Sequence, residues 1–278
     1  MSSHWVDHYR THGYAVVPGV FDAGEIAALA LEFDRIYAEG LAFGKSFRLQ
    51  NSFFALTDDA ALGPIVRMVQ WPSYFNRTLE RFRRDPRMLE ILAPLIGRDL
   101  KQIINQLHWK PPGAAMADFG FHQDSRSRRP REAYRDLAAS YIQTGIAIDP
   151  HRSENGAMVV YPGSQTLGEL PYDASRSSMS AAKDDGDLEA LGLDPAKAVT
   201  LEMAPGDVAL WGVHTLHGSG PNVTDIDRRF YINGYVVAGN CDRGEWAFRD
   251  GSPVPLPDEP SLVHYEELFE KPGPMFVE

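Results

Sequence analysis

The chain has 278 residues and a formal charge of −11, because 27 Lys and Arg oppose 38 Asp and Glu. This acidic balance argues against a general nucleic-acid binder, since phosphate contacts require a surplus of basic side chains. The single cysteine, Cys241, excludes a disulfide framework and a thiolate-rich metal site, so metal ligands have to come from histidines and carboxylates. No run approaches ~18 apolar residues and the N-terminus has no signal-peptide pattern, so we expect a soluble, cytoplasmic protein with no membrane partner.

The first hundred residues are predicted to be mainly helical. Residues 13–18 form a short β-rich run that ends at Pro-Gly. A helix is predicted over residues 22–40, with Asp22 as its N-cap and a glutamate three residues later as the capping-box partner. A second helical region is expected over residues 73–97, where Pro86 separates two helices.

From about residue 100 the pattern changes to short runs rich in β-branched and aromatic residues, bounded by Gly, Pro, Asn and Asp. Six such runs are predicted as strands: 102–109, 141–149, 157–161, 199–203, 208–213 and 230–238. Several strands without long helices between them favour a mainly β fold, a sandwich or jelly roll with flanking helices.

No repeat or change of composition marks a second domain, so we expect one domain over residues 1–278. Its parts are a helical N-terminal part (about 1–100), a jelly-roll core (about 101–240) and an extended, proline-rich C-terminal tail. Residues 175–187 are the most polar stretch and are expected to form a surface loop, with a lid over a site as the alternative.

The segment Phe121-His-Gln-Asp124 is the first candidate for metal binding. In an extended segment residues i and i+2 project from the same side, so His122 and Asp124 can bind one ion together. A third ligand is expected from a neighbouring strand, where His214 and His217 are available. A regular strand would point these two histidines in opposite directions. The turn-rich Gly-Ser-Gly-Pro-Asn after His217 places His217 at the open end of the strand, so we expect His217 as the ligand and His214 as a packed histidine.

Two histidines and one carboxylate on one face of an ion leave three adjacent positions open, which is the facial triad of non-heme Fe(II) oxygenases. Arg228 follows His217 by eleven residues, at the start of the next predicted strand. A guanidinium matches a carboxylate with two parallel hydrogen bonds, so Arg228 is predicted to anchor the far end of 2-oxoglutarate. The alternative for Arg228 is a surface salt bridge with Asp225 or Asp227.

The order of these motifs resembles the phytanoyl-CoA dioxygenase (PhyH) family of Fe(II)/2-oxoglutarate-dependent oxygenases over about residues 12–238. The resemblance rests on Gly13-Tyr-Ala-Val-Val-Pro-Gly19 before a capped helix, Gln106-Leu-His-Trp-Lys-Pro-Pro-Gly113 before His122-Gln-Asp124, Glu154-Asn-Gly-Ala-Met-Val-Val-Tyr-Pro-Gly-Ser164, and Gly206-Asp207 leading to His217-Gly-Ser-Gly-Pro-Asn222 and Arg228. It implies a double-stranded β-helix, the cupin-like jelly roll, as the core of the fold.

The resemblance also implies a set of site residues. The Fe(II) ligands and catalytic centre would be His122, Asp124 and His217. Contacts to 2-oxoglutarate are implied for Arg228, Ser219, Gln106, Thr144 and Arg48. The implied cofactors are Fe(II), 2-oxoglutarate as cosubstrate, and O₂. Related halogenases carry a small residue in place of the acidic ligand, so Asp124 favours oxygen chemistry.

The expected reaction is hydroxylation of a small-molecule metabolite with decarboxylation of 2-oxoglutarate to succinate and CO₂; desaturation, epimerisation and cyclisation stay open. The basic cluster Arg126-Ser-Arg-Arg-Pro-Arg131 is interpreted either as a solvated loop or as an anchor for an anionic substrate such as a carboxylate or phosphonate, and Lys110 as a second anchor or a strand cap. Two other classes remain: a non-catalytic jelly-roll protein that binds a metal or ligand, and a zinc-dependent hydrolase, for which Glu154 is the candidate general base.

Overall fold

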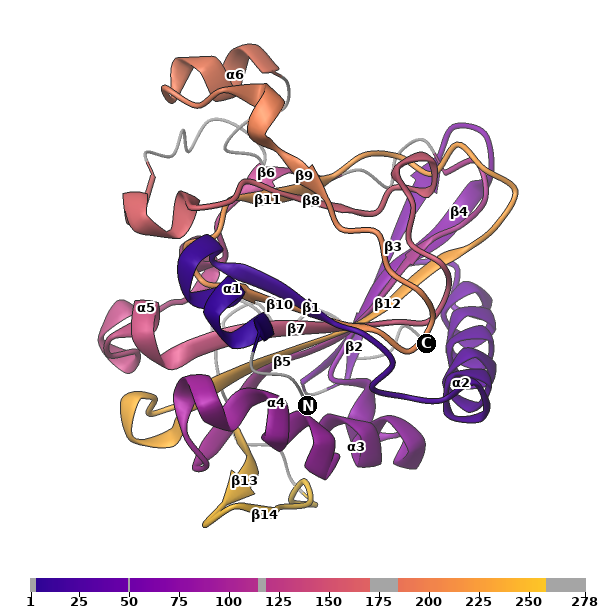
Figure 1. Ribbon diagram of the computed structural model, residues 1–278. Coiled ribbons are helices and arrows are strands. Elements are labelled where there is room, and N and C mark those ends of the chain that lie inside the picture. The colour runs from indigo at the N-terminus through magenta and orange to yellow at the C-terminus, as the bar shows by residue number, and fades with distance from the viewer. Residues whose placement is uncertain (1–3, 50, 115–118, 171–184, 259–278) are drawn as a thin grey trace.

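Two antiparallel β-sheets face each other across the interior of the computed structural model, which describes residues 4–49, 51–114, 119–170 and 185–258 (Figure 1). The larger sheet has the strand order β1-β10-β7-β12-β5-β4-β3-β2, with β13 and β14 joined to it beside β5. The smaller sheet has the order β6-β11-β8-β9. This arrangement confirms the predicted class, a mainly β jelly roll with flanking helices.

The larger sheet consists of β1 (Tyr14–Val17), β2 (Phe47–Leu49), β3 (Ser52–Asp59), β4 (Gly63–Gln70), β5 (Leu100–Lys110), β7 (Tyr141–Ala147), β10 (Val208–Gly212), β12 (Arg228–Val237), β13 (Glu245–Arg249) and β14 (Ser252–Pro253). The smaller sheet consists of β6 (Phe119–His122), β8 (Met158–Val160), β9 (Val199–Thr200) and β11 (His217–Ser219). The α-helices are α1 (His4–His12), α2 (Ala23–Ala42), α3 (Arg77–Arg83), α4 (Pro86–Ile96), α5 (Leu137–Ser140) and α6 (Asp185–Ala190).

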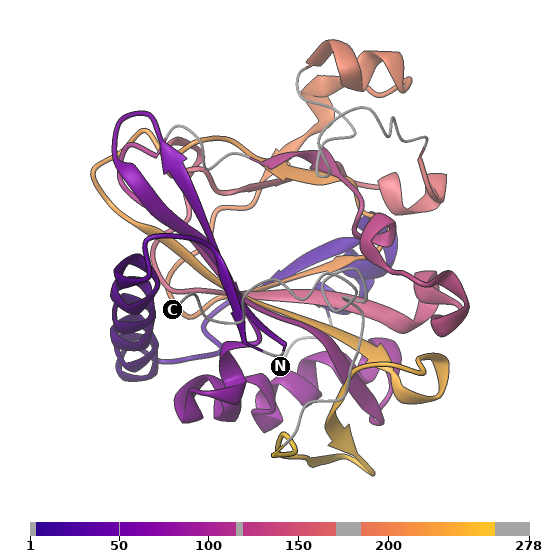
Figure 2. The same cartoon turned by 180° about the vertical axis from the view of Figure 1, so that it is seen from behind.

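Helices α2, α3 and α4 lie on the side of the larger sheet that faces away from the smaller sheet (Figures 1 and 2). Helix α2 begins with the predicted capping box, in which Asp22 accepts from the Glu25 amide and the Glu25 carboxylate accepts from the Asp22 amide. Its buried stripe, which includes Leu29 and Phe33, packs with the outward side chains of the sheet into the main apolar core.

A second apolar cluster fills the space between the two sheets. Strand β7 shows how the two cores are divided, because successive side chains of a strand point to opposite faces. Ile142 and Ile146 belong to the cluster on the helix side, whereas Tyr141 and Ala147 belong to the cluster between the sheets. Side chains on the inner face of the larger sheet therefore point toward the smaller sheet.

Each of the six predicted strands is present, within a few residues at either end. The predicted helical region 73–97 is also confirmed as α3 and α4, separated as expected at Pro86. Three strands that we did not expect, β2, β3 and β4, lie within the part predicted to be helical and extend the larger sheet beyond β5. Strand β3 ends in two aspartates and β4 begins with Gly-Pro, which weakens the β pattern of these two strands in the sequence.

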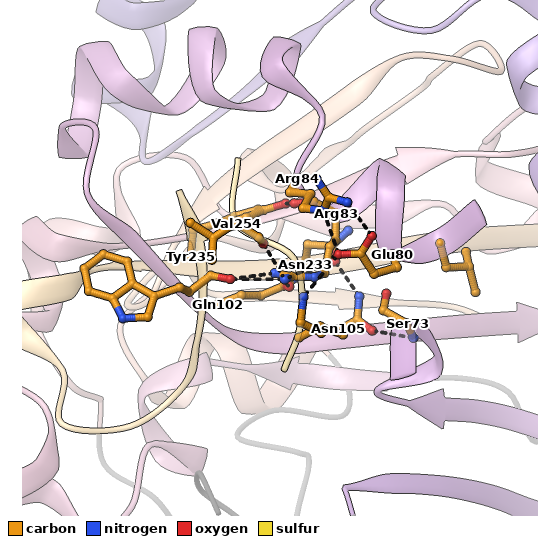
Figure 3. Close-up of polar contacts among 12 residues, drawn as sticks. Ser73, Glu80, Arg83, Arg84, Gln102, Asn105, Asn233, Tyr235 and Val254 are labelled. Carbon is orange, nitrogen blue, oxygen red and sulfur yellow. Dashed lines mark hydrogen bonds and ion pairs between the residues drawn. The ribbon is translucent and has the colours of Figure 1, made fainter. Parts of the chain in front are cut away.

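A buried polar network fastens α3 to the larger sheet (Figure 3). The Arg83 side chain is 0% exposed, and it donates to Gln102 Oε1 at 3.2 Å and to the carbonyls of Trp246 and Val254 at 3.1 and 3.0 Å. The Tyr235 hydroxyl donates in turn to the Arg83 carbonyl at 2.5 Å. The guanidinium thus joins α3, β5 and the chain around β13 and β14, so its burial is compensated by several acceptors.

The structure describes only parts of two stretches that the sequence singled out. Residues 175–184 of the predicted surface loop lie outside the described residues, and the last three residues of the stretch begin α6. Residues 251–258 of the predicted tail include β14, and the Leu256 amide donates to Glu80 on α3; residues 259–278 lie outside the described part. None of the described helices is long and apolar enough to cross a membrane.

Candidate metal centre and adjoining cavities

His122, Asp124 and His217 come together between the sheets. Strands β6 and β11 pair antiparallel with His122 directly opposite His217, and their ring centres are 4.3 Å apart. Asp124 follows β6 as the first residue of the 3₁₀ turn Asp124–Ser127. One ligand atom from each residue lies within 4.8 Å of the other two, and all three side chains are buried. This is the set of residues that the sequence predicted, and it has the spacing required to hold one ion.

Main-chain carbonyls orient both imidazole rings. Nδ1 of His122 lies 2.9 Å from the Gly120 carbonyl, and Nδ1 of His217 lies 2.9 Å from the Thr215 carbonyl. A carbonyl can only accept, so each Nδ1 carries the hydrogen and each Nε2 keeps a lone pair for a metal. Burial and the proximity of His217 lower the pKa of His122 to about 4, despite the opposing effect of Asp124. Neutral nitrogens with one carboxylate fit a divalent ion of the Fe(II) type.

Gln123, between the two ligands of the first motif, points away from the metal centre. Its amide nitrogen donates to the carbonyls of His214 and Gly168 at 2.7 and 2.9 Å, and its oxygen accepts from the Leu170 amide at 2.8 Å. His214 is half-buried and takes no part in the ligand group, as expected for the packed member of the pair. Gln123 therefore holds the ligand segment against two neighbouring loops.

A cavity of about 90 Å³ adjoins the three ligands, and its walls come from both sheets. Three of the five residues implied as contacts to 2-oxoglutarate line this cavity: Gln106, Ser219 and Arg228. The structure does not bring the other two there. The Thr144 hydroxyl donates to the Asn233 carbonyl at 3.1 Å, because strand alternation turns Thr144 to the face opposite Gln143. Arg48 lies on β2, with its guanidinium 5.0 Å from the Phe53 ring centre.

Arg228 is buried, with 4% of its surface exposed. Its Nε and Nη2 donate to the Gly156 carbonyl at 3.0 and 2.8 Å. Burial lowers the pKa of Arg228 to about 9, so the guanidinium remains charged at neutral pH. The alternative of a surface salt bridge is not what the structure shows. The next residue, Arg229, forms the ion pair instead, at 2.7 Å from Asp149.

Lys110 adds a second buried cation beside Arg228. The two residues are register partners on β5 and β12, and Lys110 is 1% exposed. Its Nζ donates to the Ser219 hydroxyl at 2.7 Å and to the Gly220 carbonyl. Lys110 thus holds Ser219, which lines the small cavity together with the buried guanidinium of Arg228, and such a buried charge is suited to an anionic ligand. The donors present therefore fit the carboxylate of a 2-oxoglutarate molecule.

His108 and Gln143 are cavity residues that were not predicted from the sequence. Both line the small cavity and a second, larger cavity next to it. His108 Nε2 lies 3.0 Å from Gln106 Oε1, and burial together with the charge of Arg228 lowers the pKa of His108 to about 3. The i, i+2 spacing of Gln106 and His108 on a predicted strand was a signal that could have placed His108 beside Gln106.

A jelly roll with a buried His-Asp-His group between its sheets defines the architecture of a facial-triad metalloprotein. The family model for phytanoyl-CoA dioxygenase (PhyH) matches residues 9–230, and the chain belongs to this family.

Curated relatives are distant but extend over most of the chain. A "probable alpha-ketoglutarate-dependent hypophosphite dioxygenase" of Stutzerimonas stutzeri is 25% identical over 83% of this chain and 77% of its own length. The dioxygenase lolE1 of Epichloe uncinata is 25% identical over 90% of this chain and 87% of its own length. An ectoine dioxygenase of Stutzerimonas stutzeri strain A1501 is 23% identical over 83% of this chain and 76% of its own length.

Solved structures show the same fold. The epimerase SnoN, in complex with Fe³⁺, alpha-ketoglutarate and nogalamycin RO, superposes with a TM-score of 0.65 at 22% identity, over 94% of this chain and 95% of that chain. EctD from S. alaskensis with bound Fe gives a TM-score of 0.65 at 19% identity, over 94% and 88% of the two chains.

Proposed function

We propose that the protein is an Fe(II)- and 2-oxoglutarate-dependent dioxygenase that hydroxylates a small-molecule metabolite, with decarboxylation of 2-oxoglutarate to succinate and CO₂. One observation carries the proposal: the buried His122, Asp124 and His217 group shares its cavity with the buried guanidinium of Arg228. A metal ligand set alone suits several chemistries, whereas a ligand set next to a carboxylate anchor suits a cosubstrate that chelates the metal. The names of the curated relatives, all dioxygenases, support the same class.

Each protein group has a defined task in this reaction. When bound, Fe(II), 2-oxoglutarate and O₂ supply the oxidising chemistry itself. His122, Asp124 and His217 would hold the ion on one face, which leaves adjacent positions for the cosubstrate and oxygen. Arg228 and Ser219 would bind the far carboxylate of the cosubstrate, with Gln106 as a further contact. The sheets on either side bury the three ligand residues, which limits the contact of the ion with bulk water.

The two rival classes have less support. A zinc hydrolase requires a general base near the ion, and the candidate Glu154 is exposed and absent from the described walls of both cavities. A non-catalytic binding protein has no need of a buried arginine beside a complete ligand set. The leading proposal therefore remains the oxygenase.

An anaerobic titration with Fe(II) and 2-oxoglutarate tests the proposal through the weak visible charge-transfer band of the chelate. The wild-type protein should form the band, and His217→Ala should lose it together with the bound iron. His214→Ala is the matched control, since it removes a histidine three residues away that is outside the ligand group, and it should keep the band. Iron binding by the wild type without a band would contradict the proposal and favour a binding protein or a hydrolase.

A further inference from the structure

A cavity of about 330 Å³ lies directly beside the small cavity of the metal centre. The two share Gln106, His108, Phe119, Asp124 and Gln143 in their walls. A molecule bound in the larger cavity would therefore lie against a metal ligand while the cosubstrate occupied the smaller one. The volume is at the lower end for small-molecule sites, which suits a compact metabolite.

Arg128 is the most buried charged residue among the described residues in the wall of this larger cavity. It is 2% exposed, and its main-chain amide donates to the Ser125 carbonyl at 3.2 Å, where it closes the turn that Asp124 begins. Its Nη2 donates to the Tyr141 hydroxyl at 2.9 Å, and the guanidinium carbon lies 5.1 Å from the Tyr141 ring centre. The position of the guanidinium is thus fixed relative to a metal ligand four residues earlier.

Gln143 adds an oriented amide to the same wall. Its Oε1 accepts from Arg128 Nη2 at 3.4 Å and from the Tyr141 hydroxyl. An arginine can only donate, so the atom that faces it is the amide oxygen and the amide nitrogen is turned the other way. Within the described part of the chain no hydrogen bond reaches this nitrogen, so its N–H groups remain as donors for a bound molecule.

Positively charged side chains outnumber negatively charged ones among the described residues that line this cavity. Among the described residues that line it, Arg67 and Arg128 are cationic and Asp124 is the only acidic one. The Asp124 carboxylate already accepts from Trp211 and faces His217, so it belongs to the metal centre. The Gln70 amide nitrogen donates to the Met68 sulfur at 4.0 Å, and its buried Oε1 has no partner among the described residues, so Gln70 adds one acceptor to an otherwise cationic wall. Such a wall favours an anionic ligand and disfavours a neutral or cationic one.

We propose that the substrate carries a carboxylate or a phosphonate-type group, which Arg128 and Gln143 bind in the larger cavity. The inference rests on the proposed oxygenase function and deepens it by naming the substrate class. Within the basic cluster 126–131, the proposal assigns the binding of the anionic group to Arg128. Arg129 is exposed, and Arg131 forms a half-exposed ion pair with Glu169. Anchoring the anionic end at Arg128 leaves the rest of the molecule beside Asp124 and the metal.

Calorimetric titration of the anaerobic complex with Fe(II) and saturating 2-oxoglutarate tests this inference with three probes: butyrate, methylphosphonate and the neutral butyramide. The wild type should bind at least one anion roughly tenfold or more tightly than butyramide, because a charged hydrogen bond is absent from the amide complex. Whichever anion binds more tightly assigns the substrate to the carboxylates or the phosphonates.

The variants separate a binding role from a structural one. Arg128→Gln should weaken anion binding roughly ten- to hundredfold, and Arg128→Lys should restore part of it through its retained charge. Arg129→Gln removes an equal charge from the adjacent exposed residue and should bind like the wild type. All of these proteins should form the visible band of the iron chelate with unchanged intensity.

The outcomes distinguish the two proposals. Absence of the band in the wild type would refute the oxygenase function itself. A normal band with no preference of the wild type for either anion over butyramide would overturn the substrate inference alone. Equal binding of the anions by Arg128→Gln and Arg129→Gln would also overturn it. The comparison of the two anions with butyramide uses only the wild-type protein. It therefore tests the substrate inference even if Arg128→Gln does not fold.

Discussion

The indole nitrogen of Trp211 donates a 2.9 Å hydrogen bond to Oδ2 of Asp124. Trp211 lies on β10 of the larger sheet, whereas Asp124 follows β6 of the smaller sheet, so this bond connects the two sheets at the metal centre. Both side chains are buried. The larger sheet therefore orients the acidic ligand, although the smaller sheet carries both histidine ligands.

Removing this donor should weaken metal binding without disturbing the ligands themselves. Trp211→Phe keeps an aromatic ring in the core but leaves the carboxylate without its partner, and partners of this kind are worth roughly 10- to 100-fold in metal affinity. An anaerobic Fe(II) titration against a competing chelator measures the loss. Trp109→Phe is the control, since Trp109 is equally buried but packs against Phe33 in the other core. Equal losses in both variants would show that the hydrogen bond has no role.

Arg228 should govern the affinity for 2-oxoglutarate and not the affinity for iron. In Arg228→Gln the charged donor to the cosubstrate is lost, which we expect to raise the 2-oxoglutarate concentration for half-formation of the visible band roughly ten- to hundredfold. Fe(II) affinity should stay within about twofold, because the ligands are unchanged. Arg229→Gln removes the adjacent charge, which is held by Asp149, and should leave both values near those of the wild type. A fall in iron affinity as large as that in 2-oxoglutarate affinity would contradict this division of roles.

Buried neutral histidines should make the metal-free protein sensitive to mild acid. Burial lowers the pKa of His151 well below 6.5, and the nearby charges of Arg228, Lys110 and Arg152 lower it further, against a hydrogen bond to the Arg229 carbonyl. The unfolded chain therefore binds a proton below about pH 6.5 that the folded chain excludes. The contribution of His151 to the free energy of unfolding is therefore fully present above pH 6.5. It is lost as the pH falls toward the pKa that His151 has in the folded protein. His108 and His122 act in the same direction.

One such histidine contributes up to about 1.4 kcal/mol per pH unit to the slope of the unfolding free energy. Urea unfolding in EDTA between pH 7 and pH 5 should therefore give a shallower slope for His151→Gln than for the wild type, by roughly that amount below pH 6. Parallel curves for the two proteins would mean that His151 accepts its proton in the folded state as readily as in the unfolded one.

Gly145 provides the space that the Phe230 ring occupies. A Cβ atom added at Gly145 would lie 2.0 Å from Cζ of Phe230, whose ring is buried in the wall of the metal-centre cavity. Gly145→Ala should therefore destabilise the protein by about 1–3 kcal/mol, as overpacking of a core does. Gly239→Ala is the control, because no atom lies within 4 Å of its added Cβ. Chemical denaturation compares the two, and equal stabilities would show that Phe230 can move aside at little cost.

Local pattern predicted much of the metal centre. The i, i+2 spacing of His122 and Asp124 and the turn after His217 depend only on short-range geometry, so they could be interpreted without knowing which strands pair. The same alternation separates Thr144 from the site, because Thr144 directly follows the cavity residue Gln143 on β7 and so faces the other core.

Other parts of the site depend on long-range pairing. The burial of Arg128, in contrast to the exposed Arg129 beside it, results from the position of Tyr141 and Gln143 on a strand of the opposite sheet. Lys110 reaches Ser219 only because β5 of the larger sheet passes close to β11 of the smaller one. No spacing in the sequence indicates such contacts between sheets.

The direct opposition of His122 and His217 across the β6–β11 pair has a consequence for the motions of the smaller sheet. A slip of one residue between these strands would turn one histidine to the opposite face and destroy the ligand set. An ion bound by both residues therefore acts as a cross-link between the two strands and opposes their separation. Amide hydrogens of β11 should consequently exchange with solvent more slowly when the ion is present. The metal would then stabilise the pairing of β6 with β11 in addition to its chemical role.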